Sequence, residues 1–289
     1  MERIIVDTDV GGDVDDAMCI AYLLAQPNCD LCGITTVSGE ADRRAMIASA
    51  LCNAAGQRIP IHVGASDPLV VDQRQPHAHQ ASRLGRWRHD REFPAADAVE
   101  FMRRVVRSHP GEITILGIGP MTNIASLFVE DPEIPGLLKR LVVMAGWFGD
   151  RTARGEIGDW NVHCDPHAAA IVYRARVGVH RSVPLDVTQD AKLSVAEFRS
   201  RFSEGPLLLV RDLVEGESAE EVWFHDPLTA ATLFDEGVCA FRRGIMSVDP
   251  HDPLQGSRTR WSSIGDEHEV AVAANLDRFF AHYFSVVSN

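Results

Sequence analysis

The sequence lacks the features of several common protein classes. No apolar run approaches the roughly 20 residues that a membrane-spanning helix needs, and no basic segment with an apolar stretch precedes the first strand-like residues. No internal repeat, low-complexity tract or Pro/Ser-rich linker interrupts the 289 residues. These absences argue against a membrane protein, a secreted protein and a chain of linked domains. They predict one domain over residues 1–289 and a cytoplasmic location.

Positive charge and paired cysteines are also scarce. The 28 lysines and arginines are outnumbered by 41 aspartates and glutamates, which gives a net charge of −13. Such a surface repels phosphate backbones, so neither nucleic acid nor an anionic membrane is an expected partner. Among six cysteines, only Cys29 and Cys32 form a C-x-x-C pair. Because no second pair exists and a strand should begin here, a redox or zinc site is disfavoured.

Short β-like runs alternate with helical patterns along the chain. Arg3–Asp7 is apolar and β-branched, and Asp16–Ala25 has a helical pattern that ends before Pro27. Further strand-like runs are Asp30–Val37, Ile61–Gly64, Ile113–Gly117, Arg140–Ala145, Arg181–Leu185, Val238–Val248 and Glu269–Ala273. Helical patterns include Arg43–Ala55, Ala96–Ser108, Pro166–Arg174 and Leu276–Val287, and two long loops cover Asp67–Pro94 and Trp147–Asp165. The alternation predicts an α/β fold with an open, mostly parallel sheet covered by helices and ligands at the carboxyl ends of its strands.

Five carboxylates crowd into the ten residues that begin at Asp7, within the segment DTDVGGDVDDA. Asp7 and Asp9 point to the same side of an extended chain, and Asp15 and Asp16 fall in the first turn of the next helix, where the dipole favours negative charge. Turn and capping chemistry explains one or two such acids. Five of them repel one another unless a cation compensates them or their pKa values rise. Because all-oxygen ligands suit Ca²⁺ or Mg²⁺, the segment predicts a divalent-cation site.

Two known acidic motifs fit this segment poorly. An EF-hand loop that started at Asp7 would have Gly11 and Met18 at positions that need acidic or amide ligands. A haloacid-dehalogenase-like phosphatase would use Asp7 as its nucleophile and would need a phosphate-binding lysine. The chain has only Lys139 and Lys192, neither in a suitable context, so the phosphatase remains a less favoured alternative.

The acidic segment resembles the opening motif of the nucleoside hydrolases, the inosine–uridine-preferring N-ribohydrolases. Other motifs that resemble this family follow in the family's order, at Gly33–Gly39, His77–His79, Ile118–Asn123, Val143–Gly146, Asp159–Asn161 with Asp165-Pro166, and His225–Pro227. Each match is short, but together they span the chain from Asp7 to Pro227. The chain is therefore identified as a member of this family by resemblance.

The resemblance implies a Rossmann-like nucleoside hydrolase fold, a bound Ca²⁺ and hydrolysis of the N-glycosidic bond of a ribonucleoside or related N-ribosyl compound to free ribose and base. The metal ligands that it implies are Asp9, Asp15, Asp16, Asp226 and the carbonyl oxygen of Ile118. The substrate-binding residues that it implies are Asp15 at the ribose 2′-hydroxyl, Asp159, Asn161 and Met144 on the far side of the sugar, and His79 in the first long loop. We further expect a homodimer or homotetramer.

Residue chemistry agrees with these roles. A cation lowers the pKa of bound water, and Asp9 beside it can take the proton as general base. His225 is next to the metal ligand Asp226, and imidazole titrates near neutral pH, so His225 can protonate the leaving base. Plainer roles stay open, because His225 could cap the following helix and His79 or Met144 could be ordinary loop and core residues. The aromatic residues Trp147, Phe148 and Trp160 could stack on a base or pack the second long loop.

Some positions depart from the family pattern. Glu40 stands where the family usually has an asparagine that binds ribose hydroxyls. We expect Glu40 near the sugar, where it would narrow substrate choice away from inosine and uridine, unless it faces solvent. Two extra residues in the acidic loop make Asp13 a possible replacement for Asp15 or Asp16. The alternative function is a catalytically weak homologue that binds a ribosyl ligand.

Overall fold

A computed structural model describes residues 1–94, 98–148, 158–215, 219–251 and 258–288 of the chain. Nine strands form one sheet in the order β10-β9-β11-β6-β5-β4-β1-β2-β3. Their bounds are β1 Glu2–Thr8, β2 Cys29–Thr36, β3 Ile61–Val63, β4 Ile113–Gly117, β5 Arg140–Met144, β6 His180–Val183, β9 Cys239–Asp249, β10 Arg258–Ser262 and β11 His268–Ala274. Neighbours from β3 to β11 are parallel, and β9 is antiparallel to β11 and β10. The predicted open, mostly parallel sheet is confirmed.

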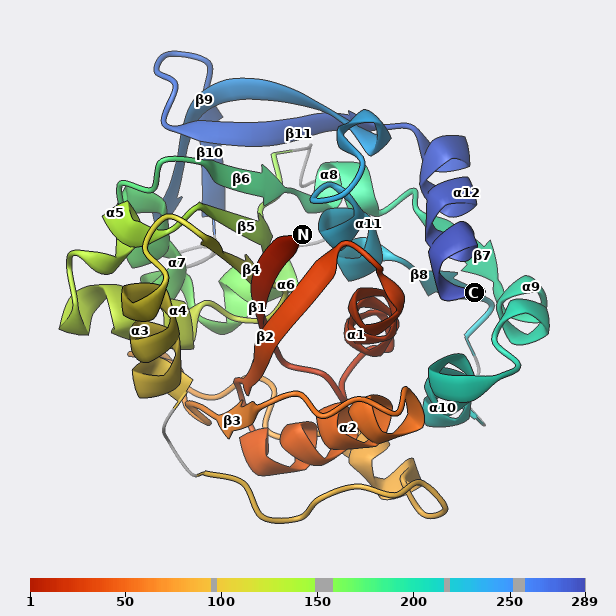
Figure 1. Ribbon diagram of the computed structural model, residues 1–289. Coiled ribbons are helices and arrows are strands. Elements are labelled where there is room, and N and C mark those ends of the chain that lie inside the picture. The colour runs from red at the N-terminus through yellow and green to blue at the C-terminus, as the bar shows by residue number, and fades with distance from the viewer. Residues whose placement is uncertain (95–97, 149–157, 216–218, 252–257, 289) are drawn as a thin grey trace.

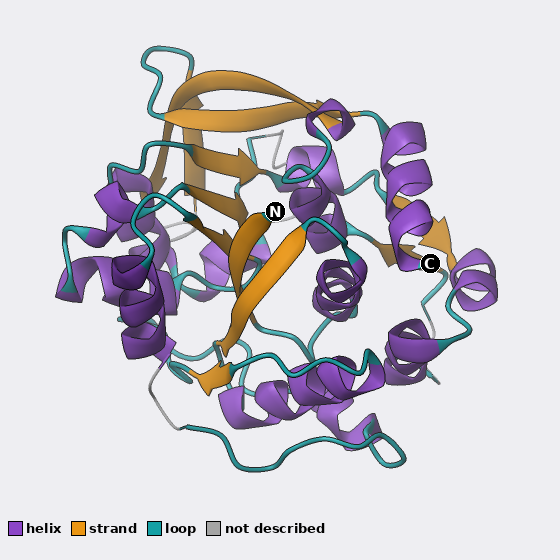
Figure 2. Ribbon diagram, viewed as in Figure 1, coloured by secondary structure: helices purple, strands orange, loops and turns teal. Residues whose placement is uncertain are grey.

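Helices cover both faces of this sheet (Figures 1 and 2). One face carries α1 Asp15–Ala25, α2 Ala41–Ala54, α10 Gly205–Leu213, α11 His225–Ala231 and α12 Leu276–Val287. The other face carries α3 Ala98–Ser108, α4 Thr122–Glu130, α5 Ile134–Leu137 and α7 Pro166–Arg174. Shorter elements are η1 His79–Arg83, α6 Trp160–Cys164, α8 Leu185–Thr188, α9 Val195–Arg201, η3 Glu236–Val238 and the antiparallel pair β7 Lys192–Ser194 and β8 Glu221–Trp223. No helix in the described part of the chain has the length and apolar character to cross a bilayer.

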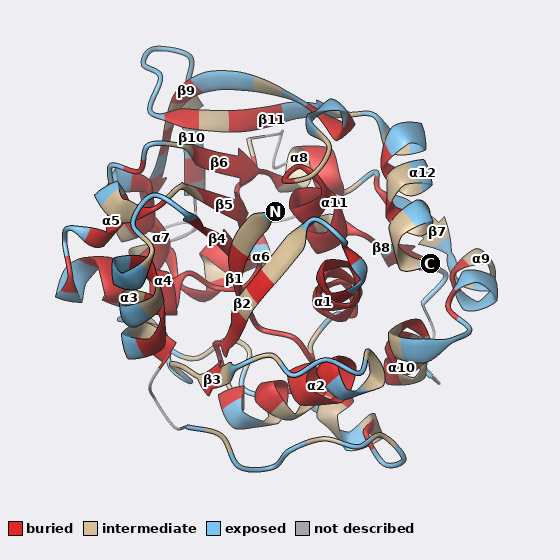
Figure 3. Ribbon diagram, viewed as in Figure 1, coloured by how far each residue is buried: buried red, intermediate tan, exposed pale blue. Residues whose placement is uncertain are grey.

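The side chains of β1 alternate between two hydrophobic cores. Ile4 and Val6 pack in the cluster that includes α1 and α12, whereas Ile5 packs in the cluster that includes α3 and α4. A parallel strand that is covered on both faces is continuously apolar, which is why β1 could be predicted. Helix α1 contacts α2, α10, α11 and α12, so it is buried over nearly all of its length (Figure 3).

The sequence pattern missed several short elements. Strands β7 and β8 have three residues each, too few to show a period of two, and β10 was not predicted either. The strand predicted at Arg181–Leu185 ends at Val183, and α8 begins two residues later. Pro184 separates the two elements, since proline has no N–H to donate to a strand ladder. Residues 149–157 of the second predicted loop and the start of the helix predicted at Ala96 lie outside the described residues.

Candidate functional site

A cavity of about 390 Å³ opens where the central parallel strands end at their carboxyl side. Its walls come from the loop after β1, the turn after β4, the end of β5 and the first turns of α1, α6 and α11. The lining residues are Asp9, Gly12, Asp13, Asp15, Asp16, Gln75, His77, His79, Ile118, Met144, Gly158, Asp159, Trp160, Asn161, Leu185, His225 and Asp226. Every site residue predicted from the sequence is among them except Glu40.

Two glycines allow the loop after β1 to pack closely against its neighbours. Gly11 has a φ of +117°, a conformation that strains residues with a side chain. A Cβ atom on Gly119 would lie 2.7 Å from Oδ1 of Asp9. The lack of a side chain at Gly119 therefore lets the Asp9 carboxylate lie directly against the turn after β4, beside Ile118.

Three carboxylates converge at one end of the cavity. Each of Asp15, Asp16 and Asp226 offers an oxygen, and these oxygens lie within 4.8 Å of one another. Asp15 and Asp16 are in the first turn of α1, and Asp226 is in the first turn of α11. Helix N-termini favour negative charge, and Thr8 Oγ1 donates a 2.5 Å hydrogen bond to Asp16 Oδ1. The two helices thus bring together acids that are more than 200 positions apart in the sequence.

Burial and mutual repulsion disfavour ionisation of this cluster. Desolvation and then the neighbouring acids raise the pKa of Asp15 to about 8. The same causes raise the pKa values of Asp16 and Asp226 well above the usual range. Burial also raises the pKa of Asp9, against the charge of Arg44 and a hydrogen bond from Gln75, which both lower it. These four carboxylic acids can all be ionised at the same time only if a cation offsets their negative charge.

The donor set fits a hard divalent cation, since every candidate ligand is an oxygen. The carbonyl oxygen of Ile118 accepts a 2.9 Å hydrogen bond from Asn161 Nδ2 and has a second lone pair. Asp7 does not line the cavity. Its Oδ1 accepts hydrogen bonds from Thr35 and Asn123, at 2.5 and 2.8 Å, and the residue is fully buried. The nucleophile that a phosphatase would need is therefore held outside the cavity.

We expect a divalent cation to raise the melting temperature more at pH 8 than at pH 5. Asp15 has a pKa of about 8 in the metal-free fold against 3.8 in the unfolded chain. Protonated Asp15 therefore stabilises the folded state relative to the unfolded chain. This contribution is complete below pH 3.8 and is lost as the pH rises through about 8. Cation binding requires the ionised acids, so it strengthens over the same window. At 100 times Kd a ligand adds ~2.7 kcal/mol, which for a chain of this length raises the melting temperature by about 4 °C. Thermal unfolding with and without Ca²⁺ measures this shift, and equal shifts at both pH values would contradict it.

The opposite wall is built by α6. Asp159 caps this helix by accepting a 2.9 Å hydrogen bond from the Val162 N–H, and burial raises its pKa to about 6. Asn161 Nδ2 donates to the carbonyl oxygens of Ile118 and Met144, at 2.9 and 3.0 Å. Asn161 therefore joins the ends of β4 and β5 to the wall that carries Asp159.

Three histidines lie on the rim. His225 begins α11, and its Nδ1 is 2.8 Å from Oγ1 of Thr188, a contact that orients the ring. His77 and His79 belong to the first long loop, and both are exposed. Nδ1 of His77 lies 3.9 Å from Oε1 of Glu40. Of these three histidines, His225 is therefore the one whose imidazole is held in a fixed orientation by a hydrogen bond.

Glu40 is the predicted site residue that the structure does not bring to the cavity. Its carboxylate accepts hydrogen bonds of 3.0 and 3.1 Å from Arg43 and one of 3.0 Å from the Ala78 N–H. The Ala78 N–H, followed by Arg43, lowers the pKa of Glu40 below its usual value. The Glu40 side chain ties the first long loop to the start of α2 and is not among the residues that line the cavity.

Some lining residues were missed by the sequence analysis, among them Gln75 and Leu185, and others such as Trp160 were left undecided. Gln75 Oε1 accepts a 2.6 Å hydrogen bond from Trp160 Nε1, which joins the two long loops across the cavity mouth. Leu185 begins α8. A glutamine in a loop and a leucine after a strand carry no motif, so no sequence signal could find them. Trp147, by contrast, does not line the cavity. It is buried, and its backbone N–H and carbonyl bond Thr259 Oγ1 at 2.8 and 2.7 Å.

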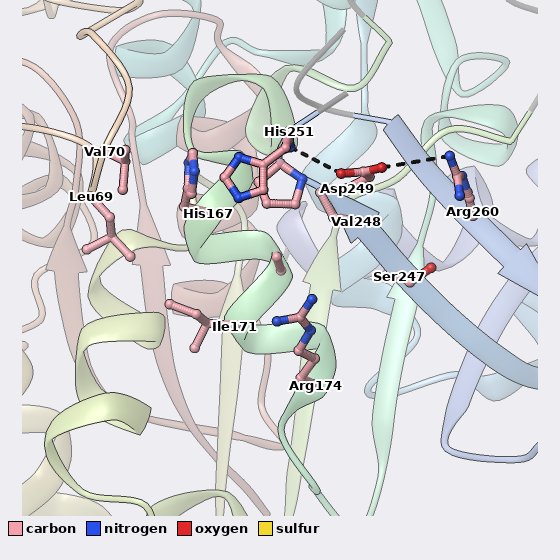
Figure 4. A pocket seen from close by; sticks show the side chains of 12 residues that line it. Leu69, Val70, His167, Ile171, Arg174, Ser247, Val248, Asp249, His251 and Arg260 are labelled. Carbon is pink, nitrogen blue, oxygen red and sulfur yellow. Dashed lines mark hydrogen bonds and ion pairs between the residues drawn. The ribbon is translucent and has the colours of Figure 1, made fainter. Parts of the chain in front are cut away.

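Two other pockets differ from the strand-end cavity in the residues that line them. A pocket of about 100 Å³ shares Asp13, Asp15 and His225 with the main cavity and extends between α9 and β8. Its further lining residues are Val14, Val195, Arg199, Val214, Ala219, Glu221, Val222 and Trp223. A third cavity of about 480 Å³ lies between α7 and β9 (Figure 4). None of the predicted site residues lines it, and its rings of His167 and His251 face each other edge-on at 5.4 Å.

Comparisons with known proteins agree with the geometry. The sequence model described as inosine-uridine preferring nucleoside hydrolase matches residues 4–281. The chain is 36% identical over 301 residues to a non-specific ribonucleoside hydrolase of Salmonella newport, covering 96% of this chain and 94% of the relative. It is 27% identical to uridine nucleosidase 1 of Arabidopsis thaliana, covering 90% and 84%. A solved plant nucleoside hydrolase superimposes with a TM-score of 0.86 at 21% identity, covering 99% and 98%, which shows the shared fold.

Proposed function

Because the chain belongs to the inosine-uridine preferring nucleoside hydrolase family, we propose that its strand-end cavity hydrolyses the N-glycosidic bond of ribonucleosides with a bound Ca²⁺. One observation carries the proposal. Three buried carboxylates converge within 4.8 Å in a cavity that also holds an aspartate, an amide and an oriented imidazole. A module that only bound a ribosyl ligand would have no need of a buried base and an oriented imidazole together.

Asp9, Asp15, Asp16, Asp226 and the carbonyl oxygen of Ile118 would hold the proposed ion. Ca²⁺ accepts six to eight oxygen ligands in flexible geometry, whereas Mg²⁺ retains several waters, so this protein-rich oxygen set favours Ca²⁺. When bound, the ion lowers the pKa of a water molecule and fixes sugar hydroxyls. Asp9 then takes a proton from the attacking water as general base.

The sugar occupies the space between the acid cluster and α6. Asp15 accepts from the ribose 2′-hydroxyl, and Asp159 and Asn161 hold the far side of the ring, with Met144 beside them. The N-glycosidic bond breaks through an oxocarbenium-like state. Carboxylates that face the ring stabilise its developing positive charge more than they stabilise the neutral sugar.

The leaving base faces His225 and the adjoining apolar pocket. Four valines and Trp223 form much of this pocket, which suits a flat heterocycle. Glu40 does not line the cavity, so it gives no reason to exclude inosine and uridine. Two relatives are named a uridine nucleosidase and a non-specific ribonucleoside hydrolase. We therefore propose ordinary ribonucleosides, uridine among them, as substrates.

A release assay tests this function. The protein is incubated with Ca²⁺ and a panel of uridine, cytidine, inosine, adenosine and nicotinamide riboside, and free reducing ribose is measured. We expect ribose from at least one ribonucleoside, with base in equal amount. Release from none of them would reject the hydrolase assignment in favour of a ribosyl-binding homologue.

His225→Ala should depress kcat most for substrates whose leaving group needs a proton. A nucleobase anion is a poor leaving group, whereas p-nitrophenolate departs without protonation. General-acid loss should cost ~10²–10⁴-fold on uridine and little on p-nitrophenyl riboside. Steady-state kinetics on both substrates measure the difference, and equal losses would show that His225 only positions the substrate.

Three other expectations stay predictions. These are a single catalytic domain over residues 1–289, a cytoplasmic location and a homodimer or homotetramer. Light scattering of the purified protein measures the oligomeric state directly.

A further inference from the structure

Arg44 lies directly beneath the acidic loop. It is on the first turns of α2 and is 0% exposed. Its Nε donates to the Ser38 carbonyl at 2.6 Å, and its two terminal nitrogens donate to the carbonyls of Asp9, of Val10 at 3.3 Å and of Gln75 at 3.4 Å. One guanidinium thus joins three segments, the loop after β1, the exit of β2 and the first long loop.

These contacts differ from those of the other buried arginine in the described part of the chain. Arg181 pairs with the carboxylate of Glu269 at 2.8 Å and donates to the Thr232 carbonyl at 2.9 Å. The guanidinium of Arg44 instead donates hydrogen bonds to four backbone carbonyls. Its charge acts on the metal-binding acids, where it lowers the pKa values of both Asp9 and Asp16 against the effect of burial.

The backbone that Arg44 bonds includes an uncommon conformation. Ser38 has a φ of +73°, and it is the single non-glycine residue with positive φ in the described ranges. This conformation is uncommon for residues with a side chain. The carbonyl of this same residue accepts the hydrogen bond from Arg44 Nε. Gly39 follows with a φ of +54°, and a Cβ there would lie 2.2 Å from the Gln75 carbonyl oxygen. The Arg44 guanidinium bonds the carbonyls of both segments at this close approach.

Gln75 links the same arrangement to the substrate side. Its backbone carbonyl accepts from Arg44, and its side chain hydrogen-bonds Asp9. The side-chain oxygen of Gln75 also accepts from Trp160 on α6. A continuous set of contacts therefore runs from Arg44 through the first long loop to the wall that carries Asp159.

We propose that Arg44 is the positioning residue of Asp9, which it holds by its fork of hydrogen bonds to the Asp9, Val10, Ser38 and Gln75 carbonyls. This inference rests on the proposed function, in which Asp9 is both metal ligand and general base. The geometry of the fork is essential to the role. A lysine keeps the charge but has one nitrogen and cannot reach four carbonyls in one plane.

Arg44→Lys tests the proposal, with Arg181→Lys as the matched control, because Arg181 is a buried arginine that does not line the cavity. Residues that orient metal ligands typically contribute 10–100-fold to metal affinity or activity. We expect Arg44→Lys to weaken Ca²⁺ binding by about tenfold or more, as measured by calorimetry, and to lower kcat by ~10²-fold with a smaller change in KM. Arg181→Lys should lower the melting temperature but leave the Ca²⁺ affinity and kcat within threefold of the wild type. An Arg44→Lys protein with wild-type Ca²⁺ affinity and kcat would overturn the proposal.

A second measurement needs no variant. The Nε hydrogen of Arg44 should exchange slowly with solvent in the wild-type protein by NMR, both without metal and with Ca²⁺. Fast exchange in the metal-free protein would show that the fork forms only after the metal binds, which would also overturn the proposal. A wild type that neither binds Ca²⁺ nor releases ribose would instead reject the proposed function itself.

Discussion

Asp9→Ala should reduce turnover by ~10²–10⁴-fold, the contribution of a general base, while the protein remains folded. Asp9 is buried at the end of β1 and lines the cavity beside Ile118. Removing one acid from a crowded cluster relieves repulsion as well as deleting a ligand, so the variant should not unfold. The measurement is kcat on uridine at saturating Ca²⁺, with circular dichroism as the check on folding. A folded variant that keeps more than about half of the wild-type turnover would reject Asp9 as the base.

Asp13→Ala is the matched control for this experiment. Asp13 belongs to the same loop and lines the same cavity, but it is exposed, whereas Asp9 is buried. We expect turnover within about tenfold of the wild type, which is small beside the loss of a general base. A loss as large as that of Asp9→Ala would mean that the two extra loop residues have moved Asp13 into the metal shell.

Removal of the metal should lower ribose release to the background rate, and Ca²⁺ should restore it. In the proposed mechanism a cation compensates the charge of the acid cluster, and the attacking water loses its proton at neutral pH only when the ion is bound. Asp226→Asn should prevent the restoration, because it replaces a carboxylate that lies within 4.8 Å of Asp15 and Asp16. The experiment treats the protein with a chelator, removes the chelator and titrates Ca²⁺, Mg²⁺ and Zn²⁺ while ribose release is followed.

Asp235→Asn serves as the control for Asp226→Asn. Asp235 follows α11, the helix that carries Asp226, but its carboxylate pairs with Arg278 at 2.7 Å on the surface. This variant should respond to Ca²⁺ as the wild type does. Full activity after chelation, or restoration by Zn²⁺ and not by Ca²⁺, would contradict the proposed site.

The part of the site on the strand ends could be predicted from the sequence, and the part on the loops could not. Asp9 and Ile118 directly follow parallel strands, and such ends meet at one edge of the sheet. Asp15 and Asp226 lie in first helical turns next to recognisable motifs. The acidic pattern itself predicted Asp9 and Asp15, whereas Ile118 and Asp226 were predicted from the resemblance to the family.

Glu40 and Gln75 show why the loops resist prediction. The position of Glu40 depends on the N–H of Ala78, 38 residues away in a loop without periodicity. Gln75 is placed by Arg44 and Trp160, which are 31 and 85 residues distant. Neither Glu40 nor Gln75 is placed by a motif, because their partners are distant in the sequence. For the same reason Arg44 resembles any exposed arginine at the start of a helix until the structure shows it buried.

The most direct test of the proposed function is the hydrolysis of uridine in H₂¹⁸O by the metal-free and the Ca²⁺-loaded protein. Attack of water on the anomeric carbon puts one ¹⁸O on C1 of ribose for each uracil released. We predict labelled ribose and uracil in equal amounts with Ca²⁺, and neither product above background without it. Unlabelled ribose, or the same rate of release with and without Ca²⁺, would contradict the assignment of the strand-end acids as a metal-dependent hydrolytic site.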